Sequence, residues 1–189
     1  MSDVRGRLDA MPLRDRFEWW LAGGRPADDA GPNVWLGVVQ LLTMPLVREL
    51  RHPEPSGERL SAAEFDRFLG AVDEVFSVLE RRQLMDAHEV LTRRLALAAA
   101  LAESGLSLPD SPFAADRVVR SVIAVVTPER LAEAERLSPI WTTLERAEIL
   151  RLRHLKQLIR LALDLRTHLT DPDAAATVSR WEPVCSTLP

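Results

Sequence analysis

The sequence predicts an all-α fold, a single-domain bundle of about six or seven helices. Two observations support this prediction: helix start and stop signals recur along the 189 residues, and apolar residues recur at spacings of three and four. One run, 118–126, also fits a strand because its β-branched residues favour extended structure. Since no second run of this kind is available to pair with it, helix is the preferred interpretation there.

The first predicted helix begins at Pro12 and ends at the glycine pair Gly23 and Gly24. Phe17 and Trp20 fall on one face of this segment. Because large apolar side chains on one helical face are typical of an amphipathic helix, we expect this face to be buried against the rest of the bundle.

The second predicted helix is the apolar segment 34–47, capped by Asn33 and apolar nearly all round, so we expect it to be buried. Pro45 removes one backbone N–H and frees the carbonyl of Leu41, and it is therefore expected to kink or interrupt the helix. The freed carbonyl needs a partner, which Thr43, water or a ligand could supply. The segment is shorter than the about 20 residues of a membrane helix, so no membrane span is expected.

The middle of the chain carries two kinds of helix start. Ser61 and Glu64 have the spacing of a capping box ahead of a stripe of apolar residues, and Asp86 and Glu89 repeat that spacing. Proline at the first helical position, directly after a capping side chain, marks three further starts. These starts are Ser111–Pro112, Thr127–Pro128 and Ser138–Pro139.

The last predicted helix is long and amphipathic and runs from about residue 139 to 169. Beyond it the periodicity is lost, although a further short helix fits between Asp173 and Trp181. The predicted domain organisation is therefore a helical bundle over residues 1–170 and a C-terminal tail over 171–189 that is partly ordered or packed back on the bundle. The apolar seam of the long helix is heptad-like and passes through Leu155, Leu158, Ala162, Leu165 and Leu169.

Charge and cysteine content narrow the function classes. The net charge of -4 disfavours nucleic-acid binding, because affinity for phosphate depends on clustered Lys and Arg. Lys156 is the only lysine, and the excess of Arg over Lys is typical of a GC-rich, bacterial genome. Cys185 is the only cysteine, so no internal disulfide can form, and a reducing, cytoplasmic location is expected.

The sequence shows no catalytic, metal or cofactor signature. Glu49 and His52 have the spacing of a di-iron ligand pair, but no second Glu-x-x-His motif accompanies them. Asp164 and His168 lie four residues apart, which fits an ordinary surface pair better than two metal ligands. We therefore expect no metal and no cofactor, and the sequence favours a non-enzymatic role.

The candidate partner-binding residues are two tryptophans and three basic residues. On a helix Trp19 points about 100° away from Trp20, so it is expected at or beyond the edge of the core. There it is either covered by a loop or the C-terminal tail, or exposed as a binding residue. Trp181 is either such a packing partner or an anchor for another protein. The basic candidates, which could meet an acidic surface, are Arg153, Lys156 and Arg160.

Together these patterns favour a non-enzymatic helical protein-interaction module, such as an adaptor, regulatory or assembly subunit of a bacterial cytoplasmic system. The expected partner is another protein, or a second copy of the chain bound through helix faces. Nucleic-acid binding stays open only if the basic residues of the last helix form one exposed stripe. The alternative is a bundle that binds or acts on a small apolar ligand near the proline. That pocket would be lined by Trp35, Val39, Thr43 and Pro45.

Overall fold

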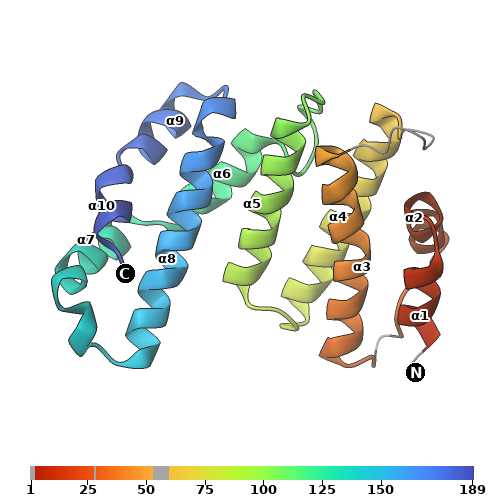
Figure 1. Cartoon of the computed structure of the whole chain (residues 1–189), viewed down its shortest axis with the longest axis horizontal. Coiled ribbons are helices and arrows are strands. Elements are labelled where there is room, and N and C mark those ends of the chain that lie inside the picture. Colours follow the sequence, from red (N-terminus) through yellow and green to blue (C-terminus); the bar gives the residue numbers. More distant parts are fainter. Residues whose placement is uncertain (1–2, 28, 53–59) are drawn as a thin grey trace. The chain divides into compact units, whose positions relative to one another are not determined.

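The computed structural model describes residues 3–27, 29–52 and 60–189, with side chains from residue 6 onward (Figure 1). All regular structure in these ranges is helical, which confirms the all-α prediction. No helix in the described ranges combines the length and the apolar character needed to cross a membrane. The α-helices are α1 (Asp3–Ala10), α2 (Leu13–Leu21), α3 (Pro32–Arg51), α4 (Ala62–Arg81), α5 (Ala87–Glu103), α6 (Ala115–Val125), α7 (Pro128–Leu137), α8 (Arg146–Leu165), α9 (Pro172–Ser179) and α10 (Glu182–Thr187). The described residues also form two 3-10 helices, η1 (Ser138–Thr143) and η2 (Arg166–His168).

These helices outnumber the six or seven expected. Within the described ranges, α1 precedes the predicted first helix, α9 and α10 follow the predicted last one, and that last helix is itself divided. By its internal contacts the chain splits into two compact units, with a boundary inside α5. The sequence instead predicts one bundle over residues 1–170 and a tail over 171–189, and this predicted division stays a prediction. Unit 1 is Met1–Val90 with Glu103–Pro112, and unit 2 is Leu91–Ala102 with Phe113–Pro189.

In unit 1, α3 contacts α1, α2 and α4 (Figure 1). Phe17 of α2 stacks on Phe68 of α4 with the ring centroids 4.3 Å apart. Trp20 of α2 meets Trp35 of α3 edge-on, with the centroids 6.3 Å apart. All four rings are buried, so the face of α2 that the sequence marks as apolar is the one that closes this core.

Ion pairs at the rim of this core join α2 and the loop after it to α4. Such partly exposed pairs contribute about 0–1 kcal/mol each, so they orient the helices more than they stabilise the unit. The pairs are Arg14–Glu64 at 2.9 Å, Arg67–Glu18 at 2.9 Å and Arg25–Glu74 at 2.6 Å.

α3 continues through Pro45, so the helix is not interrupted there, and the alternative of a kink stays a prediction. Pro45 has no N–H to donate to the carbonyl of Leu41. Arg16 of α2 supplies the donor instead, with its Nη1 atom 3.0 Å from the Leu41 oxygen. The same guanidinium donates to the carbonyls of Met11, at 2.8 Å, and Asp9, at 3.1 Å. Arg16 therefore joins the end of α1 to the middle of α3 through backbone oxygens.

The helix starts in unit 1 confirm one predicted cap and correct another. Ser61 and Glu64 form the predicted capping box of α4, in which each side chain accepts a hydrogen bond from the other residue's backbone N–H. α3 begins at Pro32 after the N-cap residue Gly31, so Asn33 lies inside the first turn and is not the cap. Proline takes the first helical position here because it has no N–H to leave unpaired.

The predicted helix starts farther along the chain are also partly confirmed. The run 118–126, which fits either a strand or a helix by sequence, is helical, since α6 covers nearly all of it. Thr127 caps α7 as predicted and accepts a hydrogen bond from the N–H of Arg130. Ser111–Pro112 does not start a helix, because Ser111 lies in a turn where its N–H donates to the carbonyl of Leu108.

The long last helix predicted from about 139 to 169 is divided into η1, α8 and η2. Leu144 and Glu145 are extended, with ψ angles of 153° and 154°. Glu145 and Glu148 form a capping box there, which stabilises a new helix start in place of a continuous helix. The predicted length is therefore wrong, but its amphipathic character is correct for α8.

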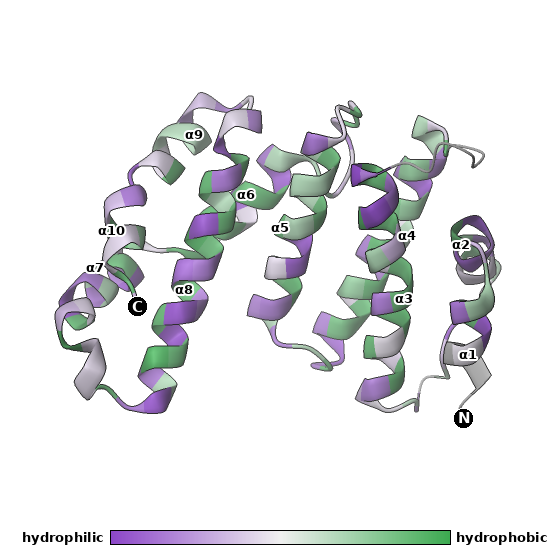
Figure 2. Cartoon of the chain, viewed as in Figure 1, coloured by the Kyte–Doolittle hydropathy of each residue, from purple (hydrophilic) through white to green (hydrophobic). Residues whose placement is uncertain are grey.

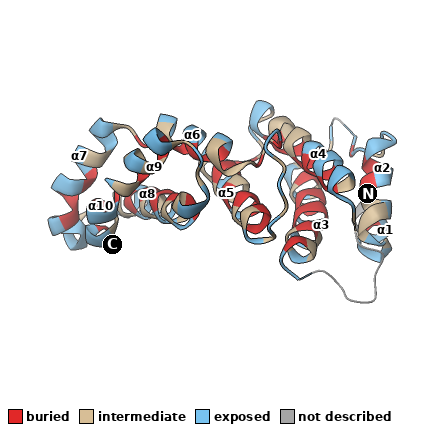
Figure 3. Cartoon of the chain, turned by 90° about the horizontal axis from the view of Figure 1, so that it is seen from above, coloured by how far each residue is buried: buried red, intermediate tan, exposed pale blue. Residues whose placement is uncertain are grey.

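α8 is the helix around which unit 2 packs, because α6, α9 and α10 all contact it. Figure 3 shows buried and exposed residues side by side along it. The predicted apolar seam is the buried face, apart from Leu169, which lies beyond α8 and is partly buried. The buried residues of α8 are Leu152, Leu155, Leu158, Ile159, Ala162 and Leu165.

The segment after residue 171 is helical and packs against the rest of unit 2. Val184 and Leu188 are buried in its core. The Ser138 hydroxyl donates to the carbonyl of Thr187, and Lys156 Nζ donates to the carbonyl of Leu188 at 2.6 Å. These contacts hold the C-terminal residues against η1 and α8.

Asp116 of α6 holds the residues just before α9. Its carboxylate accepts hydrogen bonds from the N–H groups of Thr170, at 3.0 Å, and Asp171, at 3.1 Å, and from the Thr170 hydroxyl. Arg120, one turn later, pairs with Asp171 at 2.9 Å. Partial burial raises the pKa of Asp116, but the hydrogen bonds from Thr170 and Asp171 outweigh it and leave the pKa below the ordinary aspartate value.

Arg16→Met is expected to lower the free energy of unfolding by about 1–3 kcal/mol, because three backbone carbonyls lose a charged donor. Pro45→Ala restores an N–H that can donate to Leu41, so the Arg16→Met change should cost less in that background. Urea unfolding of the wild type, both single variants and the double variant measures the coupling. Strictly additive effects would show that Arg16 does not replace the donor that proline lacks.

Asp116→Ala is expected to lower the free energy of unfolding by about 1–2 kcal/mol near pH 7. Because the folded-state pKa is lowered, this contribution is present above the unfolded-state pKa of about 4 and is lost as the pH falls through the folded-state pKa. The difference between wild type and variant should therefore shrink on acidification. Urea unfolding across this pH range tests it, with the exposed Asp66→Ala as control. A difference that stays constant with pH would contradict this role of Asp116.

Candidate functional site

The face of α8 opposite its buried residues carries a second regular stripe of side chains. Its members follow alternating spacings of four and three, which place them along one line of a helix. All six are exposed, and Leu150 keeps 51% of its surface accessible. Figure 2 shows hydrophilic residues recurring along this helix. We call this stripe the outer seam, and it consists of Arg146, Leu150, Arg153, Gln157, Arg160 and Asp164.

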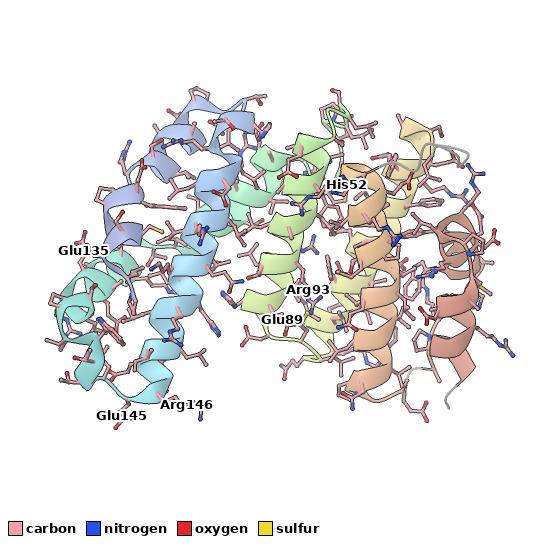
Figure 4. The ribbon with its side chains drawn as sticks, viewed as in Figure 1. His52, Glu89, Arg93, Glu135, Glu145 and Arg146 are labelled. Carbon is pink, nitrogen blue, oxygen red and sulfur yellow. The ribbon has the colours of Figure 1, made fainter. Side chains whose placement is uncertain are left out.

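The three arginines of the outer seam recur every seven residues, or about every 10.5 Å along the helix. Within the described ranges the side chains of Arg146, Arg153 and Arg160 make no hydrogen bond and no ion pair. Arg166 of the same unit, in contrast, pairs with Glu182 at 3.3 Å. Figure 4 shows Arg146 at the N-terminal end of α8, pointing outward. The outer seam therefore offers guanidinium groups that are not paired within the described part of this unit.

The order of charges along the outer seam opposes the helix macrodipole. Arg146 is the first residue of α8, and Asp164 lies in its last turn. Cations are stabilising near a helix C-terminus and anions near an N-terminus, so both residues stand at the less favourable end. Helix stability does not explain this charge order, which favours a role toward an external group.

Two further exposed apolar residues precede the outer seam. Ile140 and Trp141 of η1 keep 48% and 39% of their surfaces accessible. Exposed tryptophan and arginine are enriched at the energetically dominant positions of protein interfaces. η1 ends three residues before α8 begins, so these side chains lie close in sequence to Arg146. This composition is typical of a surface that binds protein.

A small cavity lies between α7 and α8. Its volume is about 60 Å³, far below the about 300–1,000 Å³ of a pocket for a drug-sized ligand. Its size suits ordered water rather than a substrate. Its lining combines an apolar base with a charged rim: Arg130, Glu133, Ala134, Leu137, Glu148, Arg151, Leu152 and Leu155.

A larger and more open hollow of about 520 Å³ lies at the turn between α4 and α5 in unit 1. Gln83 in this turn has a φ of 53°, a left-handed conformation that terminates α4. The N–H of Leu84 donates to the carbonyl of Leu79, and that of Gln83 donates to Glu80. The strained residue is therefore explained by the helix end, and it does not by itself indicate a ligand.

The predicted basic residues divide into two groups. Arg153 and Arg160 belong to the outer seam and are exposed. Lys156 is half-buried on another side of α8, and its Nζ atom donates a hydrogen bond to the carbonyl of Leu188 at 2.6 Å. Lys156 therefore fastens the C-terminal residues, and the charge available to a partner comes from the arginines.

The two tryptophans predicted as partner-binding residues, Trp19 and Trp181, both pack against other residues of the chain. Trp181 is 3% exposed in the core of unit 2, which favours packing over a role as an anchor for another protein. Trp19 is half-buried, and its ring lies so close to Gly24 that a Cβ atom there would be 2.2 Å from it. The loop after α2 therefore covers Trp19, which only a glycine at this position permits.

The predicted ligand pocket in unit 1 is closed by protein groups. Trp35, Val39 and Thr43 are buried, and Pro45 is partly buried. The Thr43 hydroxyl donates to the carbonyl of Val39 at 2.7 Å, and Arg16 donates to the carbonyl that Pro45 leaves free. The backbone group expected to attract a ligand is thus satisfied by an arginine.

Two features of the described part of the chain bear on metal binding and on thiol chemistry. No group of three or more His, Cys, Asp or Glu residues there is arranged to hold a metal ion. Burial raises the pKa of the Cys185 thiol, although Lys156 and Arg160 oppose this shift. The reactive thiolate is correspondingly less available at neutral pH.

The comparisons with known proteins give no match: no family model, no curated protein and no solved structure matches this chain.

Sequence reasoning found part of this surface and missed the rest. It selected Arg153 and Arg160 by charge but left out Arg146 and Leu150. A test of the polar side of the last helix for a spacing of 3.5 residues would have found both of them. Trp141 was missed because the sequence placed it inside a continuous helix, whereas it lies in η1 before the capping box.

Trp181→Ala is expected to lower the free energy of unfolding by about 3–5 kcal/mol, because it empties a buried site in unit 2. Trp141→Ala, at an exposed position, should change it by no more than about 0.5 kcal/mol. Urea unfolding followed by far-UV circular dichroism measures both. Equal costs for the two variants would contradict the burial of Trp181 and the exposure of Trp141.

Proposed function

We propose that this chain is a non-enzymatic helical protein-interaction module that binds its partner through the outer seam of α8. The observation that carries the proposal is the line of three exposed arginines, in register with the exposed Leu150. Their side chains make no hydrogen bond or ion pair in the described chain. The inner face of the same helix is fixed in the core of unit 2, so the outer seam is presented on a rigid element.

The exposed η1 residues add support to this proposal. Ile140 and Trp141 supply apolar surface next to the charged seam in the sequence, and an interface commonly combines apolar area with guanidinium groups. Single exposed apolar residues are ordinary on protein surfaces, so these two support the proposal only together with the arginines.

Charge reversal of the outer seam tests the proposed function. The triple variant Arg146→Glu, Arg153→Glu and Arg160→Glu should lose a partner that the wild type retains in affinity capture from the cells that encode the chain. The matched control reverses Arg117, Arg136 and Arg180, which are also exposed in unit 2 and give the same change in net charge.

A partner that is retained by the wild type and the control but lost from the seam variant is the expected result. Circular dichroism should show equal helix content for all three proteins. If all three retained the same proteins in the same amounts, the outer seam would not be the binding surface.

A further inference from the structure

Resting on the proposed function, we infer that the outer seam binds an acidic amphipathic helix of a partner protein, laid along α8 with one carboxylate near each of Arg146, Arg153 and Arg160. This partner helix carries carboxylates repeated every seven residues, with apolar side chains between them.

The spacing of the outer seam matches the repeat of a packed helix. Positions that alternate by four and three recur every 3.5 residues, which is the repeat at which two helices keep a continuous contact. From Arg146 to Asp164 the outer seam extends about 27 Å, which corresponds to about three heptads of a partner helix. Leu150 gives the contact an apolar position, and the guanidinium groups suit planar carboxylates.

Charge argues against a second copy of the chain as the occupant. In an antiparallel pair centred on α8, Arg146 faces Asp164 of the other copy, but Arg153 faces Gln157 and Arg160 faces Leu150. A parallel pair places arginine against arginine. Each outer seam carries three positive charges and one negative charge, a net charge of +2, so a parallel pair is repulsive and an antiparallel pair leaves Arg153 and Arg160 without an acidic partner. An acid-rich helix removes this repulsion and uses all three arginines.

Three basic residues of α8 form one exposed stripe, which is the condition under which nucleic-acid binding stays open. A nucleic acid is therefore the competing partner to an acidic protein helix. Affinity for a DNA backbone rises with the number of phosphates that a protein neutralises, and three arginines neutralise few. The apolar side chain of Leu150 makes no favourable contact with a phosphate, and the chain carries a net charge of -4. The observations therefore favour a protein helix over a nucleic acid.

A designed peptide provides a direct test on the purified full chain. The probe is a fluorescent helical peptide of three heptads. In each heptad, Glu stands at the position that faces an arginine of the outer seam, and Leu stands at the other position that faces α8. Its fluorescence anisotropy should rise with added wild-type protein. The seam variant with Glu at positions 146, 153 and 160 should bind it at least about tenfold more weakly, because attraction becomes repulsion at three sites. The control reversed at Arg117, Arg136 and Arg180 should bind within about twofold of the wild type.

A charge swap makes the test specific for the pairing. A second peptide with Lys in place of every Glu should bind the seam variant and fail to bind the wild type. A duplex DNA of 20 base pairs is titrated alongside. Two results together support the inference. The acidic peptide binds the wild type more tightly than the seam variant, and the Lys peptide binds the seam variant but not the wild type.

Two results overturn the inference. One is binding of the DNA, but not of the acidic peptide, by the wild type. The other is peptide binding that is equal for the wild type and the seam variant, or absent from both. If affinity capture still shows a partner that depends on the outer seam, only the inferred partner chemistry is wrong and the proposed function stands. If it shows none, the proposed function fails as well.

Discussion

The burial of one face of α8 is the interaction on which unit 2, and with it the candidate site, depends. Six apolar side chains of this helix lie in the core, where α6, α9 and α10 contact it. Because side chains on opposite sides of a helix are fixed relative to each other, burying these residues also determines where Arg146, Arg153 and Arg160 point. The outer seam is thus a consequence of packing: the core fixes the rotation of the helix, and the rotation aligns the arginines.

A different constraint governs unit 1, where Pro45 leaves a carbonyl without its helical donor. The expectation that such a group must find a partner is correct, but the partner is neither Thr43 nor a ligand. Arg16 reaches this carbonyl from α2 and also binds two carbonyls at the end of α1. A feature that suggested a binding pocket is therefore part of the scaffold. A broken backbone hydrogen bond indicates a functional site only when no side chain of the protein can replace the missing donor.

Local signals were informative where they act within one turn of a helix. The capping box of Ser61 and Glu64 and the Thr127 cap are both present, because they depend only on residues three apart. Failures came from competition between neighbouring signals. Asn33 lost the N-cap position to Gly31 because Pro32 occupies the first helical position, and a second capping box at Glu145 divided the long last helix. The sequence contains both signals in each case but does not show which one prevails.

The all-α class, the apolar seam of the last helix and its positive charge were determined by the sequence, because periodicity and composition depend on the residues alone. Which tryptophans are accessible was decided by the tertiary structure. Trp181 is buried and Trp141 exposed, although both stand in short polar segments. Likewise, only the fold could separate Lys156, which holds the C-terminal carbonyl of Leu188, from the arginines of the outer seam. The physical reason is that a side chain's availability depends on residues distant in sequence, and their position is fixed only when the helices pack.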